Sequence, residues 1–287
     1  MEALPRVRTL LIIGTCAIAA FQPAGTRTIY VTVVDRHGLP VAGLTRADFT
    51  IKEDGRSRTI DRVEPAHEPM QIALLLDDGG PSLGATRQAA GEFVERLQGK
   101  AEFSLTTTGG QPQTRVRSTE DPRQIYGALE KTFANAAPTT HVLDAILQSA
   151  RDFVRRRAVR PVIVAIVAEG DELSDVHADV VLQAVQQSRA MFYYIGLGRP
   201  VISGTRPSEY ESVQRNIVIG SAPRNSGGRS EQVLQATGIV PLMLQFAAEL
   251  AGQYAVVYRT DTDRARLEVT TTRRGIRLRA PARVGER

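Results

Sequence analysis

The chain has 287 residues, of which 42% are hydrophobic and 23% are charged, and its formal net charge is +5. This length and composition allow one large domain with a small module, and they exclude a fibrous repeat or a largely disordered protein. The arginines that make the chain basic are dispersed along it, which argues against a dedicated nucleic-acid-binding face.

Residues 1–24 have the pattern of an export signal. Arg6 and Arg8 precede an apolar run over residues 10–20, and Ala17 and Ala19 near its end are small residues at cleavage spacing. The run is shorter than the roughly 20 residues that span a bilayer as a helix, so an uncleaved membrane anchor is the weaker alternative. The single cysteine, Cys16, lies in this segment, so the mature chain would contain no disulfide or thiolate site. We therefore expect an exported protein, periplasmic or extracellular.

Both ends of the remaining chain have the alternating pattern of β-strands. Residues 26–68 contain three short stretches of alternating or β-branched residues separated by turn-forming sequences, which predict an N-terminal β module. Residues 254–287 contain similar stretches and predict a C-terminal β extension that joins the same module. The expected strands cover residues 28–35, 49–55, 59–63, 254–259, 266–271 and 276–279.

The middle of the chain, residues 69–253, alternates apolar strands with amphipathic helices. Residues 72–76, 162–167 and 191–196 are continuous apolar runs, typical of strands buried on both faces. Together with the helices this predicts an α/β fold with a doubly wound, mostly parallel, Rossmann-like sheet. The expected helices cover residues 83–97, 122–133, 142–156, 176–188 and 240–250. Residues 199–238 show weak periodicity, and we expect a long surface excursion there.

Two carboxylates follow the first buried strand of this domain. Ligand sites in open parallel sheets gather beyond the carboxyl ends of the strands, where Asp77 and Asp78 lie. A hard cation such as Mg²⁺ prefers oxygen ligands, and an aspartate followed by serines at two-residue spacing would supply them. Here the two possible registers are Asp77 with Gly79 and Pro81, or Asp78 with Gly80 and Ser82. The alternative is that both carboxylates accept hydrogen bonds from free backbone N–H groups at a helix start.

Short motifs at both ends of the chain and three features of its middle form one pattern. In the middle are Asp77 after its apolar strand, Thr140 four residues before Asp144-Ala145, and then residues 164–171. At the ends the motifs are Val33-Val34-Asp35, Gly43-Leu44-Thr45, Asp48-Phe49, Glu53-Asp54-Gly55, Ser226-Gly227-Gly228, Ala248-Glu249-Leu250, Gln253-Tyr254 and residues 275–280. With these motifs, over roughly residues 28–281, the chain resembles bacterial von Willebrand factor type A-related proteins.

The resemblance implies a site for a divalent cation, and it also implies that this site is degraded. The family's ligand positions fall on Asp77, Gly79, Pro81, Thr140 and Glu169, and two of these five have no side-chain oxygen. Taking both registers together, the candidate ligands for Mg²⁺ or another divalent cation are Asp77, Asp78, Ser82, Thr140 and Glu169. The resemblance further implies a protein that binds a protein partner through these loops and has no catalytic activity.

A serine hydrolase is the alternative function. Residues 80–84 fit the pattern G-x-S-x-G between a strand and a helix, which would make Ser82 the nucleophile. A hydrolase also needs a later histidine that meets the serine, and only His141 and His177 follow. His177 is expected to start a helix, and no glycine-rich oxyanion loop precedes Ser82, so the sequence favours a binding protein.

Two further function classes have little support. Arg273, Arg274, Arg277 and Arg279 lie on the final β segment, but no aromatic residues interleave with them as a platform for bases. The four histidines have no spacing typical of a zinc site. We therefore expect an exported, non-catalytic protein-binding or scaffold protein, with membrane contact only through an uncleaved signal segment.

Overall fold

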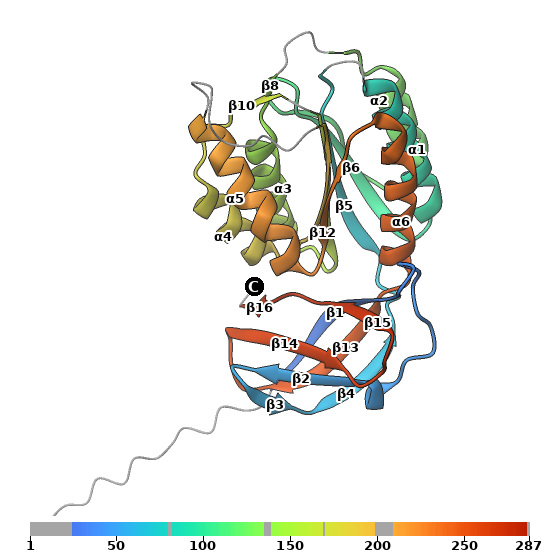
Figure 1. Cartoon of the computed structure of the whole chain (residues 1–287), viewed down its shortest axis with the longest axis vertical. Helices are drawn as coiled ribbons and strands as arrows, with labels where there is room; N and C mark the ends of the chain where they lie inside the picture. Colours follow the sequence, from blue (N-terminus) through green and yellow to red (C-terminus); the bar gives the residue numbers. More distant parts are fainter. Residues whose placement is uncertain (1–24, 80–81, 135–138, 169, 199–208, 286–287) are drawn as a thin grey trace, which may run out of the picture.

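The computed structural model describes residues 25–79, 82–134, 139–168, 170–198 and 209–285. The expected export signal (residues 1–24) and Glu169 therefore lie outside the described residues. The chain forms an α/β part and a β sandwich, which are stacked along the long axis of the molecule (Figure 1). None of the described helices has the length and apolar character needed to cross a membrane.

The α/β part is built on a six-stranded sheet with the order β12-β11-β9-β5-β6-β7. Neighbouring strands are parallel, except that β7 is antiparallel to β6. The three apolar runs are central strands and are buried on both faces, as the sequence predicts. The strands are β5 (Met70–Leu76), β6 (Ala101–Thr107), β7 (Gln113–Thr119), β9 (Pro161–Val167), β11 (Met191–Leu197) and β12 (Arg229–Val233).

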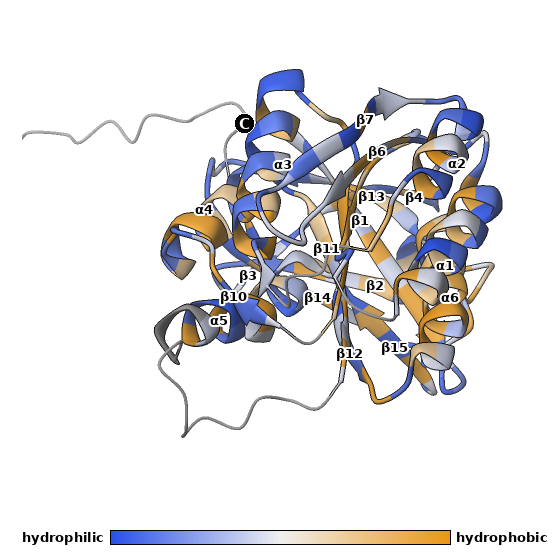
Figure 2. Ribbon diagram, turned by 90° about the horizontal axis from the view of Figure 1, so that it is seen from above, coloured by the Kyte–Doolittle hydropathy of each residue, from blue (hydrophilic) through white to orange (hydrophobic). Residues whose placement is uncertain are grey.

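Three helices cover each face of this sheet. One layer consists of α1 (Leu83–Leu97), α2 (Pro122–Glu130) and α6 (Ile239–Ala251). The other consists of α3 (Val142–Arg156), α4 (Ala178–Ser188) and α5 (Glu209–Ser226). Seen from above, the central strands are hydrophobic, and hydrophilic residues concentrate on the outer helical surfaces (Figure 2). The arrangement confirms the predicted α/β fold with a mostly parallel, doubly wound sheet.

The expected surface excursion over residues 199–238 is wrong for its described part. Residues 209–226 form helix α5, and residues 229–233 form the edge strand β12, followed by a short 3-10 helix, η2 (Ala236–Gly238). In the described part of α5, Pro223 is buried, and so are Arg215, Val218 and Ala222, three residues at the spacing of one helical face. Only two of these three are apolar, and the edge strand is only half-buried, so the apolar pattern of this region is weak.

The β sandwich consists of two four-stranded antiparallel sheets. Their strand orders are β15-β1-β13-β4 and β16-β14-β2-β3. Each sheet combines strands from both ends of the chain, because β1 lies between β13 and β15 while β14 pairs with β2. The strands are β1 (Gly25–Asp35), β2 (Phe49–Glu53), β3 (Arg56–Arg58), β4 (Ile60–Pro65), β13 (Tyr254–Thr260), β14 (Ala265–Thr271), β15 (Ile276–Arg279) and β16 (Arg283–Val284), with a 3-10 helix, η1 (Arg46–Asp48), before β2.

Candidate functional site

The two aspartates at the end of β5 are buried and hold neighbouring loops together. Asp77 accepts hydrogen bonds from the backbone N–H of Gly79 (2.9 Å) and, through its other oxygen, of Ala168 (3.1 Å). Asp78 accepts one from the N–H of Gly109 (2.8 Å). These bonds connect the loops after β5, β6 and β9. The described donors to these carboxylates thus lie in loops, and the N-cap residue of α1 is Ser82.

A glycine is required beside Asp78. A Cβ atom at Gly109 would lie 2.5 Å from Oδ1 of Asp78 and 3.2 Å from the backbone nitrogen of Gly79. Since non-bonded atoms do not approach so closely, only glycine allows the loop after β6 to donate its N–H to this carboxylate.

The environment of Asp77 favours the protonated acid more than water does. Burial raises its pKa to about 6, against the opposing effect of the hydrogen bonds from Gly79 and Ala168. The negative charge of Asp78 raises the pKa further, and the positive charge of Arg215 lowers it. Each oxygen of Asp77 therefore has one backbone N–H partner among the described residues, while burial disfavours the charged form.

Thr140 lies next to the same loops. It belongs to β8 (Thr139–Thr140), which pairs in parallel with β10 (Asp171–Glu172) at the end of the sheet opposite the sandwich (Figure 1). Its hydroxyl donates to Oγ1 of Thr108 (3.1 Å), next to the glycine that binds Asp78. The structure thus brings Asp77, Asp78 and Thr140 to one set of adjoining loops.

The remaining sequence-predicted ligands are Ser82 and Glu169. Ser82 is buried at the start of α1, and among the described residues its hydroxyl makes no hydrogen bond to Asp77, Asp78 or Thr140. Glu169 falls outside the described residues. Within the described ranges, no three His, Cys, Asp or Glu side chains are grouped so that they could hold a metal ion. The described oxygen donors at these loops are thus Asp77, Asp78 and Thr140, and the divalent cation that the family resemblance implies stays a prediction.

The geometry around Ser82 also differs from that of a hydrolase nucleophile. Ser82 has right-handed helical backbone angles (φ −82°, ψ −5°), whereas a nucleophile elbow is a strained turn. His141 and His177 are the N-cap residues of α3 and α4. His141 faces Asp144, with 3.5 Å between Nδ1 and Oδ2. In the described part of the chain, neither histidine makes a hydrogen bond with Ser82.

Sequence reasoning missed a buried arginine that supplies positive charge to the site. Arg215 of α5 is 6% exposed, and its Nη1 donates to the carbonyl oxygen of Gly170 (3.0 Å). Its charge acts on Asp77, on Glu172 of β10 and on Tyr194 of β11. The sequence predicts a surface excursion in this region, and its one signal for a buried helical face is the spacing of Arg215, Val218 and Ala222.

Burial also disfavours the charged forms of the two other groups near Arg215. Burial raises the pKa of Glu172, although hydrogen bonds from Ser174 and the charge of Arg215 oppose it. Burial likewise raises the pKa of Tyr194 to about 12, with Arg215 opposing. Arg215 is thus an internal cation within a group of buried acidic side chains.

Replacing Arg215 with leucine is expected to lower the free energy of unfolding by about 1–3 kcal/mol, because the Gly170 carbonyl loses its donor and the buried acids lose their cation. Urea denaturation monitored by circular dichroism measures this change. Arg224→Leu is the matched control, since Arg224 lies on the same helix and is exposed; its effect should stay within about 0.5 kcal/mol. Equal stability of both variants would show that Arg215 does not stabilise the site.

Large apolar side chains are exposed at this same end of the sheet. Phe133 follows α2 and is 79% exposed, Leu173 follows β10 and is 43% exposed, and Leu234 follows β12 and is 73% exposed. We call these three residues the loop apolar set. All three lie on loops near the carboxyl ends of the parallel strands, where a rigid sheet positions them.

Comparisons with known proteins find similar folds and no similar sequences. No model of a known protein family matches the chain, and no curated protein matches it at the significance required. Among solved structures, a von Willebrand factor type A protein from Catenulispora acidiphila matches with a TM-score of 0.50 and 12% identity, over 90% of this chain and 74% of that chain. BatB from Bacteroides thetaiotaomicron matches with a TM-score of 0.44 and 16% identity, over 64% of this chain and 98% of that chain. Proximal thread matrix protein 1 from the mussel byssus, whose structure has a zinc-occupied MIDAS motif, matches with a TM-score of 0.47 and 13% identity, over 72% of this chain and 50% of that chain. The first likeness confirms the fold that the sequence resemblance implies.

Proposed function

We propose that this chain, whose fold is that of von Willebrand factor type A domains, is a non-catalytic protein that binds a protein partner through the loops at the carboxyl ends of its parallel strands. The observation that carries the proposal is the exposure of the loop apolar set, Phe133, Leu173 and Leu234, on this edge. Loops positioned by a rigid sheet commonly carry the residues that contact a partner, and exposed apolar side chains on them supply area to bury.

The architecture of the loops supports a rigid binding surface. The buried carboxylates of Asp77 and Asp78 connect the loop after β5 to the loops after β9 and β6, and the hydrogen bond between the hydroxyls of Thr140 and Thr108 connects β8 to the loop after β6. A surface that is already ordered loses less conformational entropy when a partner binds. These polar residues would therefore support the loops and leave contact with the partner to the exposed side chains.

The binding that we propose does not use a metal ion. Burial disfavours the charged form of Asp77, and Arg215 supplies positive charge from within the chain. The pattern of residues 1–24 supports a location outside the cytoplasm, in the periplasm or beyond the cell.

The test is partner capture by immobilised protein from a cell-envelope extract, quantified by mass spectrometry. The variant replaces Phe133, Leu173 and Leu234 with serine. The amount of partner that it captures should fall at least about tenfold, because these side chains supply the apolar contact that binding buries. The matched control replaces Val154, Val180 and Leu244, which are exposed at 47%, 38% and 36% on the helices α3, α4 and α6.

Capture by the wild type and by the control variant should be the same in EDTA and in magnesium chloride. Three results would count against the proposal: no protein retained by the wild type, equal retention by the loop and control variants, or loss of retention in EDTA. The last result would favour a metal-dependent site despite the donor geometry.

A further inference from the structure

Part of strand β1 has one edge that no described strand covers. On one side, β1 pairs with β13 over Gly25 to Val31. On its other side it pairs with β15, but only over Thr32 to Asp35. Residues 25–31 therefore have a strand neighbour on one edge alone.

The register shows which backbone groups point to the open edge. The carbonyl of Val33 accepts from the N–H of Val41, and the N–H of Asp35 donates to Leu39, on the side of β1 away from β15. Alternate residues of an antiparallel strand direct both backbone groups to the same side. Odd-numbered residues of β1 thus face β13, and Thr26 and Thr28 face the open edge. Among the described residues, none bonds to the backbone N–H or C=O of these two threonines.

The open edge exists because β15 turns away from β1. Pro281 has no N–H with which to continue the ladder. The next N–H, of Ala282, donates to the carbonyl of Asn225 at the end of α5 (2.8 Å). Gly227 allows this approach, since a Cβ atom there would lie 2.8 Å from the carbonyl carbon of Ala280. The chain then joins the other sheet as β16.

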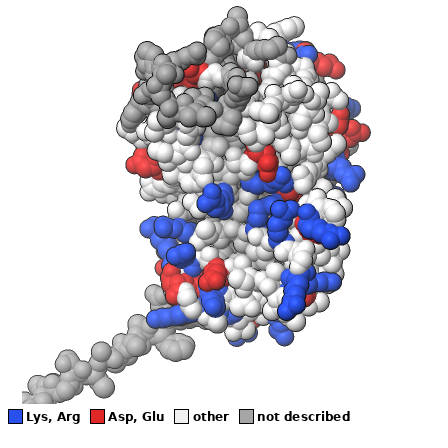
Figure 3. Space-filling model, in the orientation of Figure 1, with Lys and Arg blue, Asp and Glu red and all other residues white. Residues whose placement is uncertain are grey.

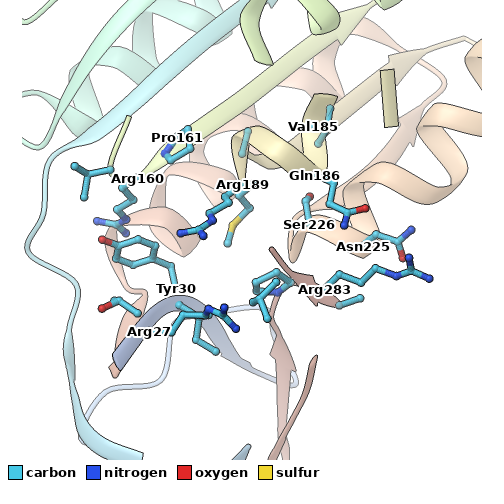
Figure 4. Close-up of a pocket in the computed structure, with 18 of the residues that line it drawn as sticks. Arg27, Tyr30, Arg160, Pro161, Val185, Gln186, Arg189, Asn225, Ser226 and Arg283 are labelled. Carbon is cyan, nitrogen blue, oxygen red and sulfur yellow. The ribbon is translucent and has the colours of Figure 1, made fainter. Parts of the chain in front are cut away.

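This edge lines a cleft of about 1180 Å³ between the sandwich and the α/β part. In Figure 4, Arg27 and Tyr30 come from β1 on one side, while Arg160 and Arg189 come from the α/β part on the other. The cleft is larger than the roughly 300–1,000 Å³ of a small-molecule pocket. It has room for a segment of chain.

The cleft and its surroundings are basic. Five arginines line it against three acidic residues, namely Arg27, Arg160, Arg189, Arg266 and Arg283 against Glu68, Asp261 and Asp263. Arg266 and Arg283 are exposed and form no ion pair within the described part of the chain. Figure 3 shows that Lys and Arg gather along the junction of the two parts on the face in view. This charge favours an acidic ligand.

We propose that the cleft binds an extended acidic peptide segment of a partner protein, which adds as a strand to the open edge of β1. Backbone groups of Thr26 and Thr28 bond to the peptide, and its acidic side chains pair with Arg266 and Arg283. The edge is recessed between two walls, so a single extended segment can reach it more readily than the folded sheet of a second copy. The cleft lies at the amino ends of the parallel strands, away from the loop apolar set, so this inference stands independently of the proposed function.

The test uses the purified protein to sort a bead-displayed library of random heptapeptides. Enriched peptides should be rich in Asp and Glu, and their binding, measured by fluorescence anisotropy, should weaken as salt increases. Thr28→Pro removes one N–H from the open edge without removing a bond to β13, so it should weaken binding at least about tenfold. Thr28→Val keeps the N–H and is the matched control. N-methylation of alternate residues of an enriched peptide should also abolish binding.

Circular dichroism and thermal unfolding establish that both variants fold. The proposal fails if no acidic peptide is enriched, if Thr28→Pro and Thr28→Val bind equally, or if N-methylated peptide binds unchanged. The charge-reversing double variant Arg266→Glu, Arg283→Glu provides a second test that does not depend on proline. It should weaken the binding of acidic peptides and leave the binding of lysine-bearing peptides undiminished. Binding unchanged by this reversal would overturn the assignment of an acidic ligand.

Discussion

Glu53→Gln should lower the free energy of unfolding by about 3–5 kcal/mol, because it removes the charge at the centre of a buried ion-pair network. The side chain of Glu53 is fully buried between the two sheets of the sandwich. It accepts from Arg27 (2.7 Å) and Arg58 (2.9 Å), and from the hydroxyls of Tyr258 (2.7 Å) and Thr260 (2.6 Å). Without the carboxylate, two mostly buried guanidinium groups lose a counter-charge. Urea denaturation at pH 7 measures the loss.

Glu64→Gln is the control for this prediction. Glu64 also pairs with an arginine, Arg62 (3.0 Å), but the two side chains are 38% and 63% exposed. Exposed pairs of this kind contribute about 0–1 kcal/mol, so the control should change stability little. Similar losses in both variants would contradict the view that burial gives the Glu53 network its importance.

The same network predicts how stability depends on pH. Burial would raise the pKa of Glu53, but the hydroxyls of Thr260 and Tyr258 and the charge of Arg27 outweigh it and lower the pKa below its usual value. A carboxyl group whose pKa is lower in the folded state contributes stability above its unfolded pKa, about 4.3, and this is lost as pH falls through the folded pKa. The stability difference between wild type and Glu53→Gln should therefore shrink in acid.

The architecture could be predicted from the sequence where burial leaves a strong pattern. Central strands such as residues 162–167 are apolar at every position because both of their faces are covered. Helix α5 could not be predicted in the same way, because one of its few buried positions is Arg215. The pairing of β1 with β13 and β15 also exceeds what local patterns specify, since it joins residues more than 200 positions apart.

The candidate site was predictable only in part. The position of Asp77 and Asp78 at the end of a buried strand follows from the apolar run before them. Their hydrogen bonds to Gly79, Ala168 and Gly109 do not, because backbone donors have no side-chain signature in a sequence. From the sequence, these carboxylates are predicted to be metal ligands or helix caps. In the structure, their hydrogen bonds connect neighbouring loops.

Glu249 of α6 is a buried carboxylate, like Glu53, and it joins the two parts of the molecule. It binds Arg229 of β12 (2.7 Å) and Arg279 of β15, so that one side chain connects the α/β part to the sandwich. Glu249 is 1% exposed. A buried acid between two arginines stabilises their arrangement only while all three charges are present.

Glu249→Gln should consequently lower the free energy of unfolding by about 3–5 kcal/mol. Glu231→Gln is a closely matched control, because Glu231 binds the same Arg229 (2.7 Å) from a side chain that is 37% exposed. Glu231→Gln should lower the free energy of unfolding by about 1 kcal/mol or less. Urea denaturation also reports the slope of the transition: a smaller slope in Glu249→Gln would show that the two parts no longer unfold together. If both variants lose equal stability with unchanged slopes, Glu249 does not couple the sandwich to the α/β part.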